Sequence, residues 1–253
     1  MSTTVDRRRN AILREVMAKG QMSVAELAEQ LGVTTETVRK DLAALQDKNA
    51  ITKGHGFVSA TAPVVESAFS DKEAMRAEEK AAIAEVAAGL IPDGATVFLD
   101  TSTTVLALAK LLVMRSGLTV VTNSLDICQA LAKSDNDLLM MGGSHRQRSN
   151  SCVGAWALAA AEQLSCDVAF FGADGVSQTG PTVRSSRELT LKGALVRRSA
   201  RSALLMDTSK LGMRGLYTFA TWDQLDTLVC ERALTDAEAR DAGMDGALER
   251  LPR

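Results

Sequence analysis

The stretch Ala95–Met114, ATVFLDTSTTVLALAKLLVM, joins a strand pattern directly to a helix pattern. An unbroken apolar run ends at Asp100 and four hydroxyl residues, and apolar residues then recur at helical spacing from Thr104 onward. A short apolar strand that leads straight into a helix is typical of a parallel sheet with helices on both faces. The stretch therefore predicts an α/β fold and places one acid and four hydroxyls where the strand ends.

The same alternation of patterns continues toward the C-terminus. A helical run rich in alanine and charge occupies 71–90, and helical runs separate the later strand-like runs, which lie at 118–123, 137–143, 167–175, 202–207 and 226–231. A capping box, Thr235-Asp-Ala-Glu238, predicts one more helix after the last of them. We therefore expect a mostly parallel sheet covered on both faces.

The composition is that of a soluble globular protein, since 46% of the 253 residues are hydrophobic and 24% are charged. No apolar run approaches the roughly 18 residues that span a bilayer. The N-terminus also lacks the apolar core of a signal peptide, so we expect a cytoplasmic protein without a membrane partner. The four cysteines form no C-x-x-C pair and there are only two histidines, so we expect no disulfide, no metal site and no cofactor.

The net charge of −2 does not by itself indicate a nucleic-acid partner, but the charge is unevenly distributed. Residues 1–60 hold nine lysines and arginines against seven acids, whereas the remaining residues hold 20 against 24. This mild asymmetry permits a DNA-binding N-terminal part without requiring one.

The first sixty residues are predicted to form three helices and a hairpin. Ser23 and Glu26 form a capping box that begins a short second helix, and Gly32 ends it. A third helix follows at 35–48, and the segment AITKGHGFVSA at 50–60 is predicted to form a small β-hairpin wing. Two helices joined by a glycine-containing turn are typical of a helix-turn-helix.

The third helix has an inner and an outer face. The inner stripe consists of Val38, Leu42 and Leu45. Hydroxyls near its N-terminus, together with Arg39 and Lys40 on the outer face, are the groups that contact phosphates and base edges in the major groove. We therefore predict contacts with double-stranded DNA from Ser23, Thr34, Thr35, Thr37, Arg39, Lys40, Lys53 and His55. The alternative is a three-helix bundle with a solvated charged face, and Arg7–Arg9 either contact phosphates or only add solubility.

The segment TAPVVESAFS at 61–70, with its proline and small residues, is typical of a connector. We predict a DNA-binding domain at 1–60, a linker at 61–76 and an α/β domain at 77–253.

Polar residues follow most of the predicted strands, and the carboxyl ends of parallel strands meet at one edge where ligands bind. Hydroxyls and helix N-terminal N–H groups suit a phosphate, and Lys210 is suited to neutralise it. Asp100, Asn123 and Asp174 are placed to form hydrogen bonds with sugar hydroxyls. The strand ends therefore predict a site for a small phosphorylated, polyhydroxylated molecule.

Each of these residues also has a purely structural interpretation. Thr103 is suited to cap its helix, Asn123 and Asp174 to occupy turns, and the Gly142–Gly143 pair to form a tight turn. The alternative for Lys210 is an exposed lysine in a loop, with no ligand. No G-x-G-x-x-G follows the first strand and no P-loop motif occurs, so a dinucleotide or P-loop site has no support.

Several motifs taken together resemble the DeoR family of bacterial transcriptional regulators. They are, in order, TVRKDLAAL, the Gly54-His55-Gly56 wing, IPDGATVFLD, LTVVTNS, GGSHR, FFGADGV and DTSKLG, and they extend over essentially the whole chain. The resemblance implies an N-terminal winged helix-turn-helix and a sensor domain related to ribose-5-phosphate isomerases and CoA transferases. It also implies a repressor of a carbohydrate uptake or catabolism operon, acting as a homodimer or homotetramer and controlled by a phosphorylated sugar.

The resemblance and the strand-end pattern together define the expected effector site. Its residues are Asp100, Ser102, Thr103, Thr104, Asn123, Gly143, Asp174, Glu188, Lys192 and Lys210. Three positions depart from the family pattern: Ser102 replaces a glycine, Pro181 replaces a leucine, and the wing reads Lys-Gly-His-Gly-Phe instead of Arg-x-His-Gly-Gly. We expect Ser102 to narrow the loop and restrict its backbone, and Pro181 to remove a backbone donor next to the pocket.

The main alternative is a sugar-phosphate isomerase-like enzyme with a DNA-binding appendage. Glu188 and Asp174 are acids of the kind that such proton transfers need. Related isomerases, however, carry an acid just before the GAD segment, where this chain has Phe171. We therefore expect a sensor that is not an enzyme. A third class, an interaction protein without a ligand, would be stabilised by no sugar phosphate.

Overall fold

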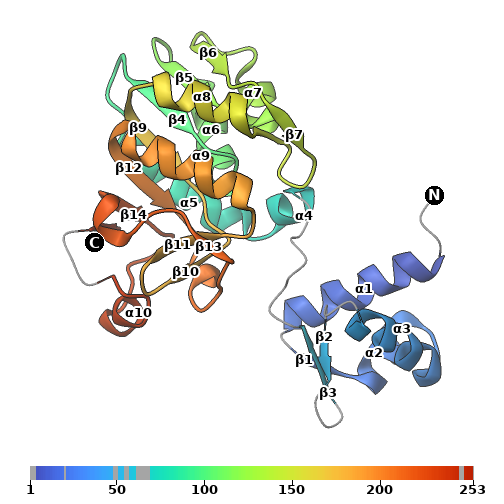
Figure 1. Cartoon of the computed structure of the whole chain (residues 1–253). Coiled ribbons are helices and arrows are strands. Elements are labelled where there is room, and N and C mark those ends of the chain that lie inside the picture. The colour runs from blue at the N-terminus through green and yellow to red at the C-terminus, as the bar shows by residue number, and fades with distance from the viewer. Residues whose placement is uncertain are drawn as a thin grey trace. The chain divides into compact units, whose positions relative to one another are not determined.

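The computed structural model describes residues 4–19, 21–47, 51–53, 57–60, 69–244 and 248–252. The chain folds as two compact units, Met1–Glu66 and Ser67–Arg253 (Figure 1). The first contains the described helices and strands of residues 4–60, and the second contains those of residues 69–252.

The described part of the first unit contains three helices and a three-stranded antiparallel sheet in the order β1-β3-β2. The elements are α1 (Thr4–Lys19), β1 (Gln21–Ser23), α2 (Val24–Leu31), α3 (Thr35–Asp47), β2 (Ile51–Lys53) and β3 (Phe57–Ala60). Buried side chains from all three helices and from β3 form one core, for example Ile12, Leu27, Leu42 and Val58. The predicted winged helix-turn-helix is confirmed.

Local sequence signals account for the turn between α2 and α3. The Ser23 hydroxyl accepts a hydrogen bond from the Glu26 backbone N–H at 3.2 Å, and the Glu26 carboxylate accepts one from the Ser23 N–H at 2.7 Å. Gly32 ends α2 with φ at 63°, a conformation that glycine adopts without steric cost. The predicted inner stripe of α3 is buried and consists of Val38, Leu42 and Leu45.

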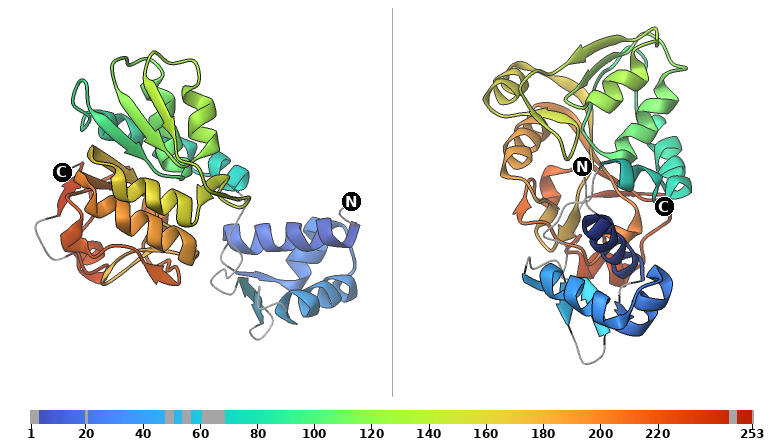
Figure 2. Two further views of the ribbon diagram at one scale, coloured as in Figure 1. Left: turned by 45° about the horizontal axis from the view of Figure 1, so that its top comes forward. Right: turned by 90° about the vertical axis from the view of Figure 1, so that its right-hand side faces the viewer.

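The second unit is built on a seven-stranded parallel sheet in the order β15-β14-β12-β9-β4-β5-β6 (Figures 1 and 2). Its strands are β4 (Thr96–Leu99), β5 (Thr119–Thr122), β6 (Asp137–Met140), β9 (Cys166–Phe171), β12 (Ser199–Leu205), β14 (Thr227–Val229) and β15 (Glu249–Leu251). All six neighbouring pairs are parallel, which confirms the mostly parallel sheet expected from the sequence.

Helices cover both faces of this sheet because its strands are apolar on both sides. In β4, Val97 and Leu99 belong to one core with α5 (Ala77–Ala88), α6 (Thr103–Leu112) and α7 (Leu125–Leu131). Phe98, between them, points to the opposite face and belongs to the core with α8 (Ala155–Gln163) and α9 (Ser186–Arg197). Figure 2 shows the two helical layers.

Smaller elements extend from the ends of the sheet. They are the β7 (Ser144–Arg146) and β8 (Ser151–Val153) hairpin, the antiparallel strands β10 (Gly175–Ser177), β11 (Gly180–Val183) and β13 (Tyr217–Thr218), the short helices η1 (Thr208–Lys210) and η2 (Trp222–Gln224), and α10 (Asp236–Asp241). The predicted Thr235–Glu238 capping box is present at the start of α10. Pro181 lies in β11, where its carbonyl accepts a hydrogen bond from the Phe219 N–H at 3.2 Å.

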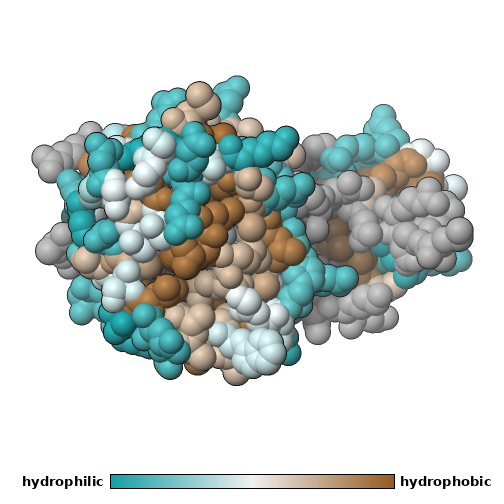
Figure 3. Space-filling view, turned by 90° about the horizontal axis from the view of Figure 1, so that it is seen from above, coloured by the Kyte–Doolittle hydropathy of each residue, from teal (hydrophilic) through white to brown (hydrophobic). Residues whose placement is uncertain are grey.

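The β6 edge of the large sheet carries apolar side chains toward solvent. Leu139 and Met140 of β6 are exposed, as is Trp156 of α8. Figure 3, which looks onto the β6 side of the second unit, shows apolar side chains gathered on this face. Among the described residues, no helix is long and apolar enough to cross a membrane.

Helix α4 (Phe69–Ala74) lies in the range that the sequence assigns to the linker. It packs against α6, where Glu73 pairs with Lys110 at 2.8 Å. The Lys80 ammonium donates hydrogen bonds to the carbonyl oxygens of Lys72 and, at 2.6 Å, of Met75. These contacts make α4 part of the second unit, which therefore begins before residue 77. Residues 61–68 lie outside the described residues.

Candidate DNA-binding surface and effector site

The outer face of α3 is arranged as the sequence predicts. Glu36, Arg39 and Lys40 are exposed, while Val38 and Leu42 lie underneath with no accessible surface. The Arg39 guanidinium lies 3.9 Å from the Glu36 carboxylate, and both side chains are about two-thirds exposed, at 65% and 66%. Exposed pairs of this kind contribute little free energy, so Arg39 is available to another partner.

Some of the predicted DNA-binding hydroxyls have local structural roles. Thr34 accepts a hydrogen bond from the Thr37 N–H at 3.2 Å, and their hydroxyls lie 2.9 Å apart, so Thr34 caps α3. Ser23 caps α2, and Thr35 is exposed. Lys53 lies in β2, and His55 lies outside the described residues.

Asp41, which the sequence reasoning did not single out, holds α1 against α3. Its carboxylate is 2% exposed and accepts from the Arg8 guanidinium at 2.6 Å and from the Arg9 guanidinium at 2.9 Å. Two of the three N-terminal arginines therefore have a structural partner. The signal was an acid next to Arg39 and Lys40 on the helix that carries the predicted basic face.

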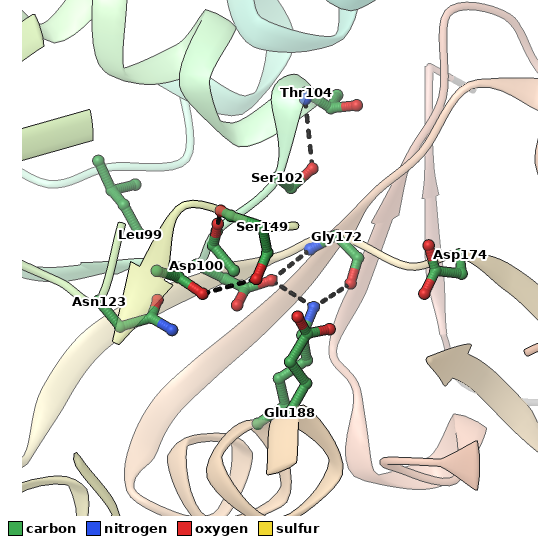
Figure 4. Close-up of polar contacts among 12 residues, drawn as sticks. Leu99, Asp100, Ser102, Thr104, Asn123, Ser149, Gly172, Asp174 and Glu188 are labelled. Atoms are coloured by element: carbon green, nitrogen blue, oxygen red, sulfur yellow. Dashed lines mark hydrogen bonds and ion pairs between the residues drawn. The ribbon is translucent and has the colours of Figure 1, made fainter. Parts of the chain in front are cut away.

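The expected effector residues follow neighbouring strands of the sheet (Figure 4). In the ladder, Leu99 of β4 lies beside Thr122 of β5 and Phe170 of β9, so the residues after them share one edge. Asp100 is the first residue after β4, and Asn123 is the first residue after β5. Asp174 follows β9, and the Asp207–Lys210 segment follows β12. The sheet thus brings together the strand-end residues that the sequence groups.

Asp100 and Lys192 form a buried ion pair at the centre of the edge. The Lys192 ammonium lies 2.5 Å from the Asp100 carboxylate and donates to the Gly172 carbonyl at 2.7 Å. The Gly172 N–H donates to the same carboxylate oxygen at 3.0 Å. Burial alone would lower the pKa of Lys192, but the negative charges of Asp100 and Glu188 raise it above its usual value. The pair ties β4, β9 and α9 together.

The hydroxyl loop after β4 is held by its own contacts. Ser102, not Thr103, caps α6, because its hydroxyl accepts from the Thr104 N–H at 3.2 Å. The Thr101 hydroxyl donates to the Ser149 carbonyl at 2.7 Å, and Thr103 and Thr104 are buried.

The structure explains how a serine fits at the position where the family resemblance predicts a glycine. Ser102 has φ at −159°, an extended conformation open to any residue, so its side chain does not strain the loop. Its space is provided by Gly172, where an added Cβ would lie only 2.3 Å from the Cβ and hydroxyl of Ser102. The two positions are complementary in size.

Asn123 carries an oxygen that lacks a partner among the described residues. Its side chain is 1% exposed, and its amide nitrogen donates to the Cys152 carbonyl at 3.2 Å. The amide oxygen is buried and accepts no hydrogen bond in the described part of the chain. In Figure 4 the amide points from the end of β5 toward Asp100 and Glu188. A buried acceptor of this kind favours a ligand that donates a hydroxyl proton.

Glu188 pairs with Arg146, a residue that the sequence reasoning quoted in GGSHR but did not place in the site. The Arg146 guanidinium lies 3.1 Å from the Glu188 carboxylate and 3.0 Å from the Ser149 hydroxyl. Gly143 precedes this hairpin with φ at 143°, and a Cβ there would lie 2.6 Å from the Val153 carbonyl. Gly143 is therefore needed for the close approach of β7 and β8.

Asp174 lies among cations. The Lys72 ammonium of α4 lies 2.9 Å from the Asp174 carboxylate. The same carboxylate accepts a hydrogen bond from the backbone N–H of Arg184 at 3.1 Å. Burial by itself would raise the pKa of Asp174, but Lys72, followed by Arg184 and Lys192, holds it below its usual value. Lys72 was missed because it falls in the predicted linker, 102 residues away.

Lys210 is half-buried beside this group. Burial lowers the pKa of Lys210, the cations Lys72 and Arg184 add to the decrease, and Asp207 and Asp174 oppose it. The neighbourhood of Asp174 thus has three cationic side chains, those of Lys72, Arg184 and Lys210, against the two carboxylates of Asp174 and Asp207, an arrangement that favours an added anion.

Comparison with known proteins agrees with both parts of this description. The DeoR-like helix-turn-helix domain matches residues 8–63, and the DeoR C terminal sensor domain matches residues 75–232. The chain belongs to the DeoR family. It is a DNA-binding transcriptional regulator, and the unit that carries the strand-end site is the family's sensor domain.

Two relatives match over most of their length. The glycerol-3-phosphate regulon repressor of Escherichia coli (strain K12) is 31% identical over 223 residues, covering 87% of this chain and 88% of the relative. The HTH-type transcriptional regulator GlpR of Haloferax volcanii is 31% identical over 236 residues, covering 92% of each chain. Among solved structures, ribose 5-phosphate isomerase A from Methanocaldococcus jannaschii is 19% identical over 52% of each chain, with a TM-score of 0.38.

Proposed function

We propose that this regulator represses a carbohydrate uptake or catabolism operon and that a phosphorylated sugar or polyol, bound at the strand ends of the sensor domain, controls its affinity for operator DNA. The cationic group around Asp174 carries the proposal, because Lys72, Arg184 and Lys210 outnumber the two carboxylates beside them, Asp174 and Asp207. The buried Asn123 oxygen adds an acceptor for a ligand hydroxyl. An anionic group and hydroxyls are the features that a phosphorylated sugar combines.

A thermal-shift panel tests the effector. It includes glycerol 3-phosphate, because the relative from Escherichia coli is named for that regulon. Pentose and hexose phosphates, their unphosphorylated counterparts and inorganic phosphate complete the panel. A ligand that binds only the folded state stabilises it by about 2.7 kcal/mol at 100 times its dissociation constant. We expect at least one phosphate ester to raise the melting temperature while its unphosphorylated counterpart does not. A flat panel would favour the interaction protein without a ligand.

The DNA-binding arrangement is proposed from symmetry. In a homodimer or homotetramer, the α3 helices of paired first units would enter successive major grooves of a repeated operator. The effector would alter DNA affinity only to the extent that it binds one arrangement of the protein more tightly than another.

Replacing Arg39 with alanine is expected to weaken operator binding by about 1–3 kcal/mol, because a base-reading arginine contributes free energy of that order. The comparison uses gel shifts on an operator fragment that the wild-type protein selects from random-sequence DNA. Arg201→Ala is the matched control, since Arg201 is a half-exposed arginine of the second unit. Equal affinity of the two variants would show that Arg39 does not contact the operator.

Sensing is favoured over catalysis by the position just before the GAD segment. Phe171 has no accessible surface there, and its ring packs 5.8 Å from Phe98 and 6.0 Å from Phe219. An apolar core residue therefore occupies the place where related isomerases carry an acid. Following pentose and hexose phosphates by NMR with the purified protein tests this, and sustained aldose–ketose interconversion would restore the enzyme alternative.

A further inference from the structure

Helix α4 is attached to the sensor domain through charged side chains and through Phe69, which packs against the apolar core that α5 and α6 share. It has six residues, too few to be stable as an isolated helix, so its position depends on tertiary contacts. One face is held to α6 by the Glu73–Lys110 pair, and the other is held to the strand ends by the Lys72–Asp174 pair. In chain order, α4 is also the first described element after the DNA-binding unit.

The Lys72–Asp174 contact lies at the place where the cations outnumber the acids. Lys72 is 29% exposed and Asp174 is 10% exposed, so a small anion can reach the ammonium while the carboxylate remains largely covered. Lys210 forms no hydrogen bond or ion pair with another described side chain, although it is close enough to Lys72 and Arg184 for their charges to lower its pKa. A phosphate that enters beside Lys210 would repel Asp174 and attract Lys72.

We propose that Lys72 is an effector-binding residue supplied by α4, and that binding of a phosphate group exchanges its Asp174 partner for the phosphate. The inference rests on the proposed function and adds to it the residue that transmits binding. Lys72 has one partner without effector and another with it, so each state fixes α4 differently. This is the differential contact that a ligand must make in order to shift an equilibrium. Because α4 leads back to the DNA-binding unit along the chain, the exchange couples effector to operator.

The test measures coupling and not only affinity. Thermodynamic reciprocity requires that operator DNA change effector affinity by the same factor by which effector changes operator affinity. Effector dissociation constants are therefore measured by calorimetry on the full chain, with and without a saturating operator fragment. The probes are inorganic phosphate and the phosphate ester that most stabilises the wild-type protein in the panel.

For the wild type we expect the two dissociation constants of the ester to differ by about 5-fold or more, which is the usual lower range of allosteric coupling. Lys72→Met should bind both probes more weakly, by about tenfold, since a charge-assisted hydrogen bond is lost. For this variant, the ratio of the ester dissociation constants measured with and without operator should fall close to one. Lys72→Arg keeps the charge and should retain most of the wild-type ratio.

Lys110→Met is the matched control, because it removes the other ion pair of α4 and leaves the strand-end site unchanged. It should keep the wild-type affinity and ratio. Asp174→Asn removes the competing carboxylate, so it should bind inorganic phosphate more tightly than the wild type. The role of Lys72 would be overturned if Lys72→Met kept the wild-type ratio of dissociation constants, or if Lys110→Met lost as much affinity and coupling as Lys72→Met does. Neither result would contradict the proposed effector site itself. If no phosphate ester binds the wild type, the proposed function fails and this inference fails with it.

Discussion

Lys192→Met is expected to lower the free energy of unfolding of the sensor domain by about 3–5 kcal/mol, the usual cost of removing one member of a buried ion pair. The variant leaves the Asp100 carboxylate, 1% exposed, with only the Gly172 N–H and its own loop as partners. Methionine approximates the length of the lysine stem, so the loss reflects the missing charge more than a cavity. Urea denaturation followed by far-UV circular dichroism measures the effect.

Two further variants separate the charge from the packing. Lys110→Met breaks an exposed pair on the same domain and should cost no more than about 1 kcal/mol. Adding Asp100→Leu to Lys192→Met removes both charges and should recover much of the lost stability. If Lys192→Met unfolds no more easily than Lys110→Met, the buried pair is not a main support of the strand ends.

The pH dependence of Lys192→Met follows from the same reasoning. Burial already raises the pKa of the Asp100 carboxyl beside Lys192, and loss of the cation raises it further, so the folded variant binds the proton more readily than the folded wild type does. The variant should therefore gain stability relative to the wild type as the pH is lowered from neutral. An unchanged difference across that range would indicate that water or another group solvates Asp100.

The fold followed from the sequence because its signals are local and repeated. The alternation in β4, with Phe98 on one face and Val97 and Leu99 on the other, belongs to a strand buried on both sides. The grouping of Asp100, Asn123 and Asp174 at one edge followed from the parallel topology alone, since strand ends in such a sheet meet there.

The ion pairs within the site could not be predicted from the sequence, because each pair joins residues far apart in the chain. Lys72 meets Asp174 across 102 residues, and Lys192 meets Asp100 across 92 residues. Composition and spacing indicate which charges reach the edge but not which ones neutralise each other. The fit of Ser102 against Gly172 is of the same kind, since it depends on the distance between two loops after different strands.

Lys210→Ala is expected to bind operator as the wild type does and to lose its response to effector. Lys210 lies in the sensor domain, so its removal changes no group on the α3 face. The half-buried ammonium forms no ion pair with the described side chains, and a phosphate would supply that partner. A hydrogen bond to a charged group contributes about 1.5–3 kcal/mol, so effector affinity should fall by roughly 10- to 150-fold. Gel shifts with increasing effector measure the response.

Arginine at the same position tests whether the charge is what matters. Burial and the neighbouring cations lower the pKa of Lys210, so the free site loses this proton at a lower pH than an ordinary lysine does. An anion binds the protonated form, and effector affinity in the wild type should therefore fall as the pH rises through that lowered pKa. Lys210→Arg stays protonated throughout, since the guanidinium pKa exceeds about 12, and its affinity should not fall over the same range. A normal effector response in Lys210→Ala, or the same decline with pH in Lys210→Arg, would place the phosphate elsewhere.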